Sequence, residues 1–285
     1  MSDELAATAN AAGLTLLGSR PKFWSYIAET WRRLPFAATL ALYRLQADAQ
    51  QDRLGILWIL LRPVMQATVY GVVFYYILSS SARPANFVPY LLIGVFVFDF
   101  YGSSVSRGSK AITGNTKLVQ SLGFPRILLP ISTTLEQAVR MIPMSALLIV
   151  LLLIWREPIS WRWLLLIPIL LVMWIFNMGM AFIVARLSVH LRDLQQVIPF
   201  INRFLFYTSG VFFSFERVLA DRPDLLRLIE MVPTYEFISL ARGVLMEGHS
   251  ISPVVLIGAP VWALAAFVFG VIFFWRAEVR YGLED

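Results

Sequence analysis

The stretch LLLIPILLVMWIFNMGMAFIVA, residues 164–185, holds 22 residues without one charged side chain. A bilayer core about 30 Å thick is crossed by roughly 20 apolar residues in a helix. Backbone N–H and C=O groups find no water in lipid, so a crossing segment must satisfy them internally. The stretch therefore predicts a membrane-spanning helix.

Five more apolar runs of comparable length flank this stretch. They lie near residues 63–80, 87–105, 127–154, 197–215 and 253–275. Hydrophobic residues make up 58% of the 285-residue chain and charged residues only 15%, which is outside the balance of soluble domains. We therefore expect an all-α integral membrane protein with six transmembrane helices.

Most Lys and Arg residues fall on one side of the six predicted spans. They precede the first span, occupy the loops after the second and fourth spans, and recur in the tail. Cytoplasmic loops carry such an excess in membrane proteins, so both termini are expected in the cytoplasm. Because the basic excess follows this topology, the sequence pI of 9.8 does not indicate nucleic-acid binding.

The sequence offers no catalytic or metal-binding set. It has no cysteine, and its two histidines, His190 and His249, are too few for a histidine-built metal site. Residues 108–117 lack the glycine spacing and the Gly-Lys-Ser/Thr ending of a phosphate-binding loop. We expect a protein that is not an enzyme, binds no cofactor itself and has no ATP site of its own.

Outside the spans, the chain divides into segments of distinct composition. Residues 1–21 are predicted to be disordered, residues 22–55 to form a cytoplasmic interfacial helix, and residues 56–285 to form the six-span domain. Within that domain, the loop 106–125 is long enough for a short helix between two turns. The segment 216–246 is too long for a simple link and is half apolar.

The predicted interfacial helix carries aromatic and basic residues together. Trp24 and Trp31 recur at helical spacing, Arg32 lies on another face, and Pro35 marks a bend or a fresh helix start. This combination favours a helix that lies flat in the lipid headgroup layer. A helix that merely packs on other protein is the alternative.

The segment 216–246 predicts two short amphipathic helices on the outer face. The first is expected from Arg217 to about Met231 and the second from Thr234 to about Met246. Each is expected to bury one side only.

Each ionisable residue within a predicted span costs about 2.5–3.5 kcal/mol to insert into the membrane. We therefore expect every such residue to have a structural or functional role. Glu136 and Arg140 are four residues apart and are expected to form an ion pair along one helix face. Such a pair either neutralises itself for insertion or serves the passage of a substrate. Asp99 and Arg203 are candidates for a second pair between helices.

Aromatic residues crowd the first, second and fifth predicted spans. Aromatic faces stack on sugar rings, and tyrosine hydroxyls bond to sugar hydroxyls. The same residues are also typical of an interfacial belt and of lipid-facing positions. Both interpretations remain open from the sequence.

Several local patterns together resemble the membrane subunit of ABC-2 type polysaccharide exporters, the family that moves O-antigen, capsule and teichoic acid. The residues that carry the resemblance are Asp52–Pro63 (DRLGILWILLRP), Phe124–Pro130 (FPRILLP), His190–Leu194 (HLRDL), and Pro233 followed by Arg242. Each pattern is weak alone, and their order and spacing on six spans make the set specific. The family often has Asn before the proline, where this chain has Val232.

The resemblance implies a half-transporter in the cell inner membrane. Two copies would pair around a central path for a lipid-linked glycan, and two separate ABC ATPase subunits would use ATP and Mg²⁺ beneath them. It assigns Ser109, Lys110, Ile112, Asn115, Lys117, Leu118 and Leu122 to ATPase coupling. It assigns Trp58, Tyr70, Phe74, Asp99, Phe100, Tyr101, Arg203, Phe206 and Tyr207 to the substrate path, and Phe212, Phe213, Pro233, Tyr235 and Arg242 to an outer gate.

The identity of the cargo stays open at this point. An O-antigen-like polymer and an actinobacterial cell-wall galactan are both compatible with the resemblance. The alternatives are an ABC-2 exporter of small hydrophobic compounds and a membrane scaffold or glycosyltransferase of a glycan-assembly complex. A secondary transporter is disfavoured because the spans show no internal repeats.

Overall fold

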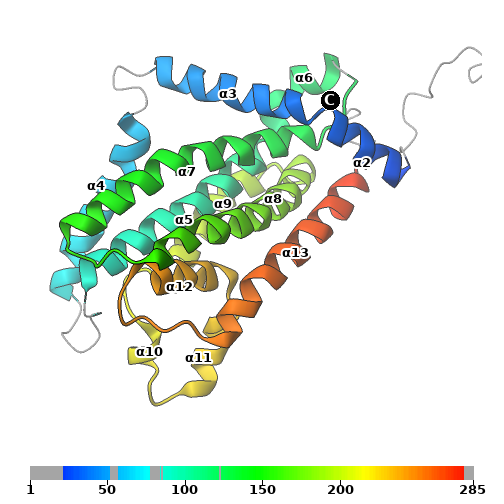
Figure 1. Cartoon of the computed structure of the whole chain (residues 1–285). Helices are drawn as coiled ribbons and strands as arrows, with labels where there is room; N and C mark the ends of the chain where they lie inside the picture. The colour runs from blue at the N-terminus through cyan, green and yellow to red at the C-terminus, as the bar shows by residue number, and fades with distance from the viewer. Residues whose placement is uncertain (1–21, 52–56, 78–83, 85, 122, 279–285) are drawn as a thin grey trace, which may run out of the picture.

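The computed structural model describes residues 22–51, 57–77, 84, 86–121 and 123–278. Every regular element in these residues is a helix, and the long helices lie side by side as a bundle (Figure 1). The segment 1–21, predicted to be disordered, lies outside the described residues, as does Leu122 of the predicted coupling set.

Five described helices are long and apolar enough to cross a bilayer. They are α4 (Leu57–Ile77), α5 (Phe87–Ser109), α7 (Leu128–Ile154), α8 (Leu166–His190, preceded by η2, Trp161–Leu165) and α13 (Pro253–Trp275). They correspond to the first four predicted spans and the last. The prediction of a multi-pass helical membrane protein is confirmed.

The predicted span 197–215 does not form a helix of spanning length. It is replaced by α9 (Leu194–Thr208), whose 15 residues cover about 22 Å at 1.5 Å per residue, less than a bilayer core of about 30 Å. The helix ends before Gly210, which has a φ of +67° that an L side chain rarely adopts. The number of full spans among the described residues is therefore five, and the prediction of six is not confirmed.

The two ends of the bundle carry different short helices (Figure 1). One end, which we call the α3 end, carries α2 (Phe23–Arg32), α3 (Leu34–Gln51), η1 (Thr113–Asn115) and α6 (Thr116–Ser121). The opposite end, the α11 end, carries α10 (Phe215–Val218) and α11 (Pro223–Glu230), and α12 (Pro233–Leu245) lies between these two and the long helices.

The described part of the predicted interfacial segment, residues 22–51, forms two helices, not one. The break falls at Arg33, whose N–H bonds to the carbonyls of Glu29 and Thr30, and α3 begins directly after it. Pro35 lies in the first turn of α3, where a missing N–H costs no helical hydrogen bond. The expectation of a fresh helix start near this proline is confirmed.

The helices packed most tightly together are α8 and α13. A Cβ placed on Gly179 of α8 would lie 2.3 Å from the backbone carbon of Ala266, and one on Gly270 would lie 2.5 Å from the oxygen of Gly179. Backbones this close require glycine and are typical of helix pairs within membranes. α5 is the most buried spanning helix, with 78% of its apolar stretch covered, whereas α4 has only 11% covered.

The structure corrects the prediction for the segment 216–246. Instead of one helix over 217–231 there are two short ones, α10 and α11. α12 is buried on every side, from Thr234 to Leu245, between α5, α8 and α13, so it is not a surface helix that buries one face. One buried face was expected from the apolar residues of this segment, but the structure buries the charged residues Glu236 and Arg242 as well.

Candidate functional site

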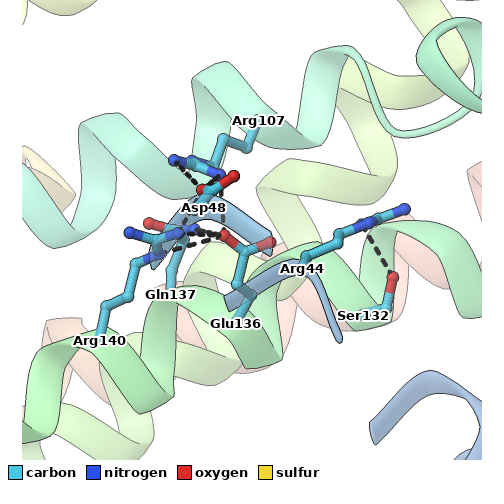
Figure 2. Close-up of polar contacts among 7 residues, drawn as sticks. All are labelled: Arg44, Asp48, Arg107, Ser132, Glu136, Gln137 and Arg140. Carbon is cyan, nitrogen blue, oxygen red and sulfur yellow. Dashed lines mark hydrogen bonds and ion pairs between the residues drawn. The ribbon is translucent and has the colours of Figure 1, made fainter. Parts of the chain in front are cut away.

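Under α3, five ionisable side chains from three helices form a charge cluster (Figure 2). Its centre is Glu136 on α7, whose side chain is only 1% exposed. Glu136 Oε1 lies 2.9 Å from Arg140 Nη2 on the same helix and 2.8 Å from Arg107 Nη1 near the end of α5. Gln137 Nε2 donates a further hydrogen bond to the same oxygen over 3.3 Å.

The second carboxylate of the cluster comes from α3. Asp48 Oδ2 lies 2.5 Å from Arg140 Nη2 and 3.4 Å from Arg107 Nη1. Two guanidinium groups therefore lie between two carboxylates, which satisfies charges that would otherwise be costly to bury. The arrangement fixes α3 against both α5 and α7.

Arg44, one turn before Asp48 on α3, adds a third guanidinium. Its Nη1 donates to Ser132 Oγ over 3.2 Å and its Nη2 donates to Asn115 Oδ1 over 3.1 Å. Burial lowers the pKa of Arg44, and the nearby Glu136 opposes that shift. Arg44 forms no ion pair within the described part of the chain, so the cluster carries one positive charge in excess.

The predicted ion pair between Glu136 and Arg140 is thus present, but it does not stand alone. Arg44, Asp48 and Arg107 were missed from the sequence. Asp48 is 92 residues away from Arg140 along the chain, so only the fold brings them together. One feature of the sequence could have indicated these missed residues. A charged pair within an apolar run is costly to insert, which implies that further charged partners surround it.

The predicted coupling segment contains a short helix between turns, as expected for the loop 106–125. Lys110 and Lys117 are exposed, and Asn115 and Leu118 are half-buried. Ser109 and Ile112 are buried within the chain.

Hydrogen bonds from α3 and α9 tie this segment to other helices. Asn115 accepts from Arg44 on α3, and Thr113 Oγ1 accepts from Gln195 Nε2 in the first turn of α9 over 2.7 Å. The segment is therefore linked directly both to α3 and to α9.

Glu278, the last described residue of the chain, forms hydrogen bonds at the α3 end. Glu278 Oε2 accepts from the Tyr26 hydroxyl over 2.7 Å, and Glu278 Oε1 accepts from the Arg126 backbone N–H over 2.8 Å. Burial raises the pKa of Glu278, while these two hydrogen bonds oppose the shift. The contact joins α2, the start of α7 and the end of α13.

Aromatic side chains from the predicted substrate path gather between α4 and α9. The ring of Tyr70 lies 5.3 Å from Phe206, and that of Phe74 stacks on Phe212 at 4.1 Å. Tyr207 lies 5.6 Å from Phe212. One predicted gate residue thus belongs to the same aromatic group as four predicted path residues.

Other residues of the predicted path are placed differently. Phe100 and Tyr101 are buried in the core, where Tyr101 stacks on Phe176 of α8. Asp99 and Arg203 form no ion pair in the described structure. Trp58 is half-buried near the start of α4.

At the α11 end, Arg242 of α12 binds three backbone carbonyls. It donates to the oxygens of Tyr90 at 3.0 Å, Gly210 at 2.9 Å and Val211 at 3.1 Å. Its guanidinium carbon also lies 3.3 Å from the centre of the Tyr90 ring. Arg242 therefore joins α12 to α5 and to the turn after α9.

The other predicted gate residues surround this contact. Phe212 and Tyr235 are buried, and Phe213 and Pro233 are half-buried. Tyr235 donates to Glu216 Oε1 of α10 over 2.6 Å. Glu216 and Tyr90 were not identified from the sequence, because their partners lie on other elements.

Comparison with known proteins agrees with this architecture. The profile of the ABC-2 type transporter family matches residues 38–246, which is more than half of the chain. The O-antigen export system permease protein RfbA of Myxococcus xanthus is 22% identical over 252 residues, covering 88% of this chain and 93% of that protein. An RfbA permease of Klebsiella pneumoniae is 22% identical over 175 residues, covering 61% of this chain and 67% of that protein. The chain belongs to the ABC-2 type transporter family, as a membrane subunit whose ATPase is a separate protein.

Proposed function

We propose that this chain is the permease half-subunit of an ATP-driven exporter that carries a lipid-linked polysaccharide out of the cytoplasm. The observation that carries the proposal is the similarity to an O-antigen export permease along 88% of this chain. An O-antigen-like polymer and a cell-wall galactan are the cargo candidates. Two copies of the chain would work with two ABC ATPase subunits, which bind the ATP and Mg²⁺.

The exposed coupling segment is the part of the chain that we expect to contact the ATPase. Lys110 and Lys117 would meet that partner directly. Movement of the segment would be transmitted through the hydrogen bond of Asn115 with Arg44 on α3 and through that of Thr113 with Gln195 on α9. The charge cluster would make α3, α5 and α7 move together.

The path for the sugar chain is proposed along α4 and α9. α4 is the least covered spanning helix, and α9 exposes Phe200 and Phe204, which are 72% and 67% exposed. A second copy that packs on these surfaces would cover them and enclose a path beside Tyr70 and Tyr207. Phe100 and Tyr101 are left out of this path, since both are packed inside one chain.

Purification of the tagged full chain from its own membranes tests this function. We expect an ABC ATPase to come with it, and its ATP hydrolysis to rise with lipid-linked glycan but not with small hydrophobic compounds. Stimulation by hydrophobic compounds alone would favour the drug-export alternative. Recovery of the chain alone or with glycosyltransferases would overturn the proposal.

The proposed orientation places the α3 end in the cytoplasm. The chain has no cysteine, so a single one can be introduced and labelled without a background. Lys117→Cys should react with an impermeant maleimide only in opened cells, and Asp224→Cys on α11 should react in intact cells. The reverse pattern would contradict the orientation.

A further inference from the structure

A small cavity with a mixed polar and apolar wall lies at the α11 end, outside the charge cluster and the aromatic group. Its volume is about 220 Å³, which is room for roughly seven water molecules at about 30 Å³ each. That space is below the range of about 300–1,000 Å³ typical of sites for drug-sized ligands. Its lining includes Asn86, Tyr90, Glu216, Arg217, Glu247 and His249.

Three separate elements build this cavity. Asn86 and Tyr90 stand at the start of α5, Glu216 lies on α10, and His249 follows α12. Glu247 has an exposed side chain, so the lining reaches the surface of the protein. The cavity is therefore accessible from the side where a cargo would leave.

The polar groups on its wall are held in place by internal contacts. Glu216 accepts hydrogen bonds from Tyr235 at 2.6 Å and from Ser214. His249 Nε2 lies 3.3 Å from Ser239 Oγ, and its ring lies 6.4 Å from that of Tyr90. Groups fixed before a ligand arrives lose little entropy on binding.

The charge state of these groups provides donors and acceptors together. Burial alone would raise the pKa of Glu216, but hydrogen bonds from Ser214 and Tyr235 outweigh it and hold the pKa below the ordinary 4.5. Burial, and then Arg242, lowers the pKa of His249 below 6.5, so at pH 7 its ring offers one donor and one acceptor.

The lining does not match a metal ion or a strongly charged ligand. No group of three or more His, Cys, Asp or Glu side chains that could hold a metal occurs in the described residues. The guanidinium of Arg217 offsets one of the two carboxylates of Glu216 and Glu247, which leaves the lining with a single net negative charge. A neutral ligand with many hydroxyl groups fits a wall of mixed donors and acceptors.

We propose that this cavity binds one sugar unit of the exported glycan as the chain emerges at the α11 end. The proposal deepens the proposed function and rests on it. One sugar ring suits the size of the cavity, and its hydroxyls pair with the carboxylate of Glu216, the ring of His249 and the amide of Asn86. Binding at this site would oppose movement of the emerging glycan back toward the cytoplasm.

Saturation-transfer NMR on the full chain in lipid nanodiscs tests the proposal, with free galactose, mannose, rhamnose and N-acetylglucosamine as probes. We expect transfer to at least one sugar and binding at least about tenfold weaker in Glu216→Gln and His249→Ala, because each change weakens or removes a hydrogen-bonding group of the wall. Glu247→Gln alters an exposed side chain of the lining and should weaken binding without affecting folding. Asp224→Asn, an exposed change on α11 outside the lining, should bind as the unmodified chain does.

Two results would overturn the cavity proposal: no transfer to any of the sugars, or equal transfer in all variants. An export assay in cells separates this failure from that of the proposed function. Normal polysaccharide export without sugar binding would reject only the cavity. Sugar binding at the cavity in a protein that exports no polysaccharide would instead reject the proposed function on which the inference depends.

Discussion

Asp48 of α3 and Arg140 of α7 are joined by an ion pair of 2.5 Å, although 92 residues separate them in the chain. The pair fastens a helix at the α3 end to a spanning helix that reaches the opposite end (Figure 1). Arg140 also contacts Glu136, so the pair extends into the interior of the bundle. Movement of α3 would therefore be transmitted to α7.

The Asp48–Arg140 pair should show measurable coupling. We expect Asp48→Asn and Arg140→Gln to destabilise the chain less in combination than the sum of the two single effects. For residues in contact, the coupling is typically about 0.5–3 kcal/mol. Thermal unfolding of the four proteins in nanodiscs gives this number. Strict additivity would mean that the pair contributes nothing, as holds for many exposed ion pairs.

Glu136→Gln should be among the most destabilising single changes. It removes the central carboxylate from two guanidinium groups and leaves them with Asp48 alone. Breaking a buried charge pair costs about 3–5 kcal/mol. The matched control is Asp224→Asn, an exposed change that should stay within about 0.5 kcal/mol. A stability for Glu136→Gln equal to that of the control would contradict a structural role for the cluster.

Leu118→Pro should abolish transport without loss of membrane insertion. Leu118 lies in the first turn of α6, where a proline disfavours the helical backbone of the preceding Lys117 and so distorts the start of α6. The spanning helices do not depend on α6, and the amount of protein in membranes should not change. ATP-dependent export in vesicles is the measurement. Normal export by this variant would remove the segment from the coupling mechanism.

Arg242→Lys should weaken the α11 end even though the charge is kept. The guanidinium binds three carbonyls at once, and an ammonium group lacks the planar fork to do so. Each buried carbonyl left unpaired costs about 1–3 kcal/mol. Faster hydrogen exchange of the amides around Gly210 is expected. Unchanged exchange there would show that one carbonyl contact suffices.

Acid should loosen the contact between Glu216 and Tyr235. The pKa of Glu216 is below 4.5 in the folded chain, so its contribution to stability is present above pH 4.5 and is lost as the pH falls through the folded-state pKa. The melting temperature measured from pH 6 downward should fall less steeply for Glu216→Gln than for the unmodified chain. Parallel curves for the two proteins would exclude Glu216 as a contributor.

Much of the fold was predictable because lipid imposes a simple rule on sequence. An uncharged run such as residues 164–185 leaves few structures other than a spanning helix, and α8 is found there. The same rule failed for residues 197–215, where length and composition resemble a span. The chain turns at Gly210 instead, and the backbone groups freed by the turn are satisfied by the side chain of Arg242.

The candidate site was predictable only in part. Glu136 and Arg140 lie on one helix, so their spacing alone indicated the contact. Asp48, Arg44 and Arg107 come from other helices, and nothing in the sequence around them indicates that they contact Glu136 or Arg140. Phe100 was expected on the substrate path because it is aromatic, but its helix faces the core at that position.

The amino-acid sequence by itself determined that the protein is a helical membrane protein, because apolar length and the need for internal backbone hydrogen bonds are local properties of each run. Only the tertiary structure decided that α12 is buried and that Arg242, Glu136 and Asp48 find their partners. Burial of a charge depends on groups that come from distant parts of the chain, and those groups meet only after the helices have packed.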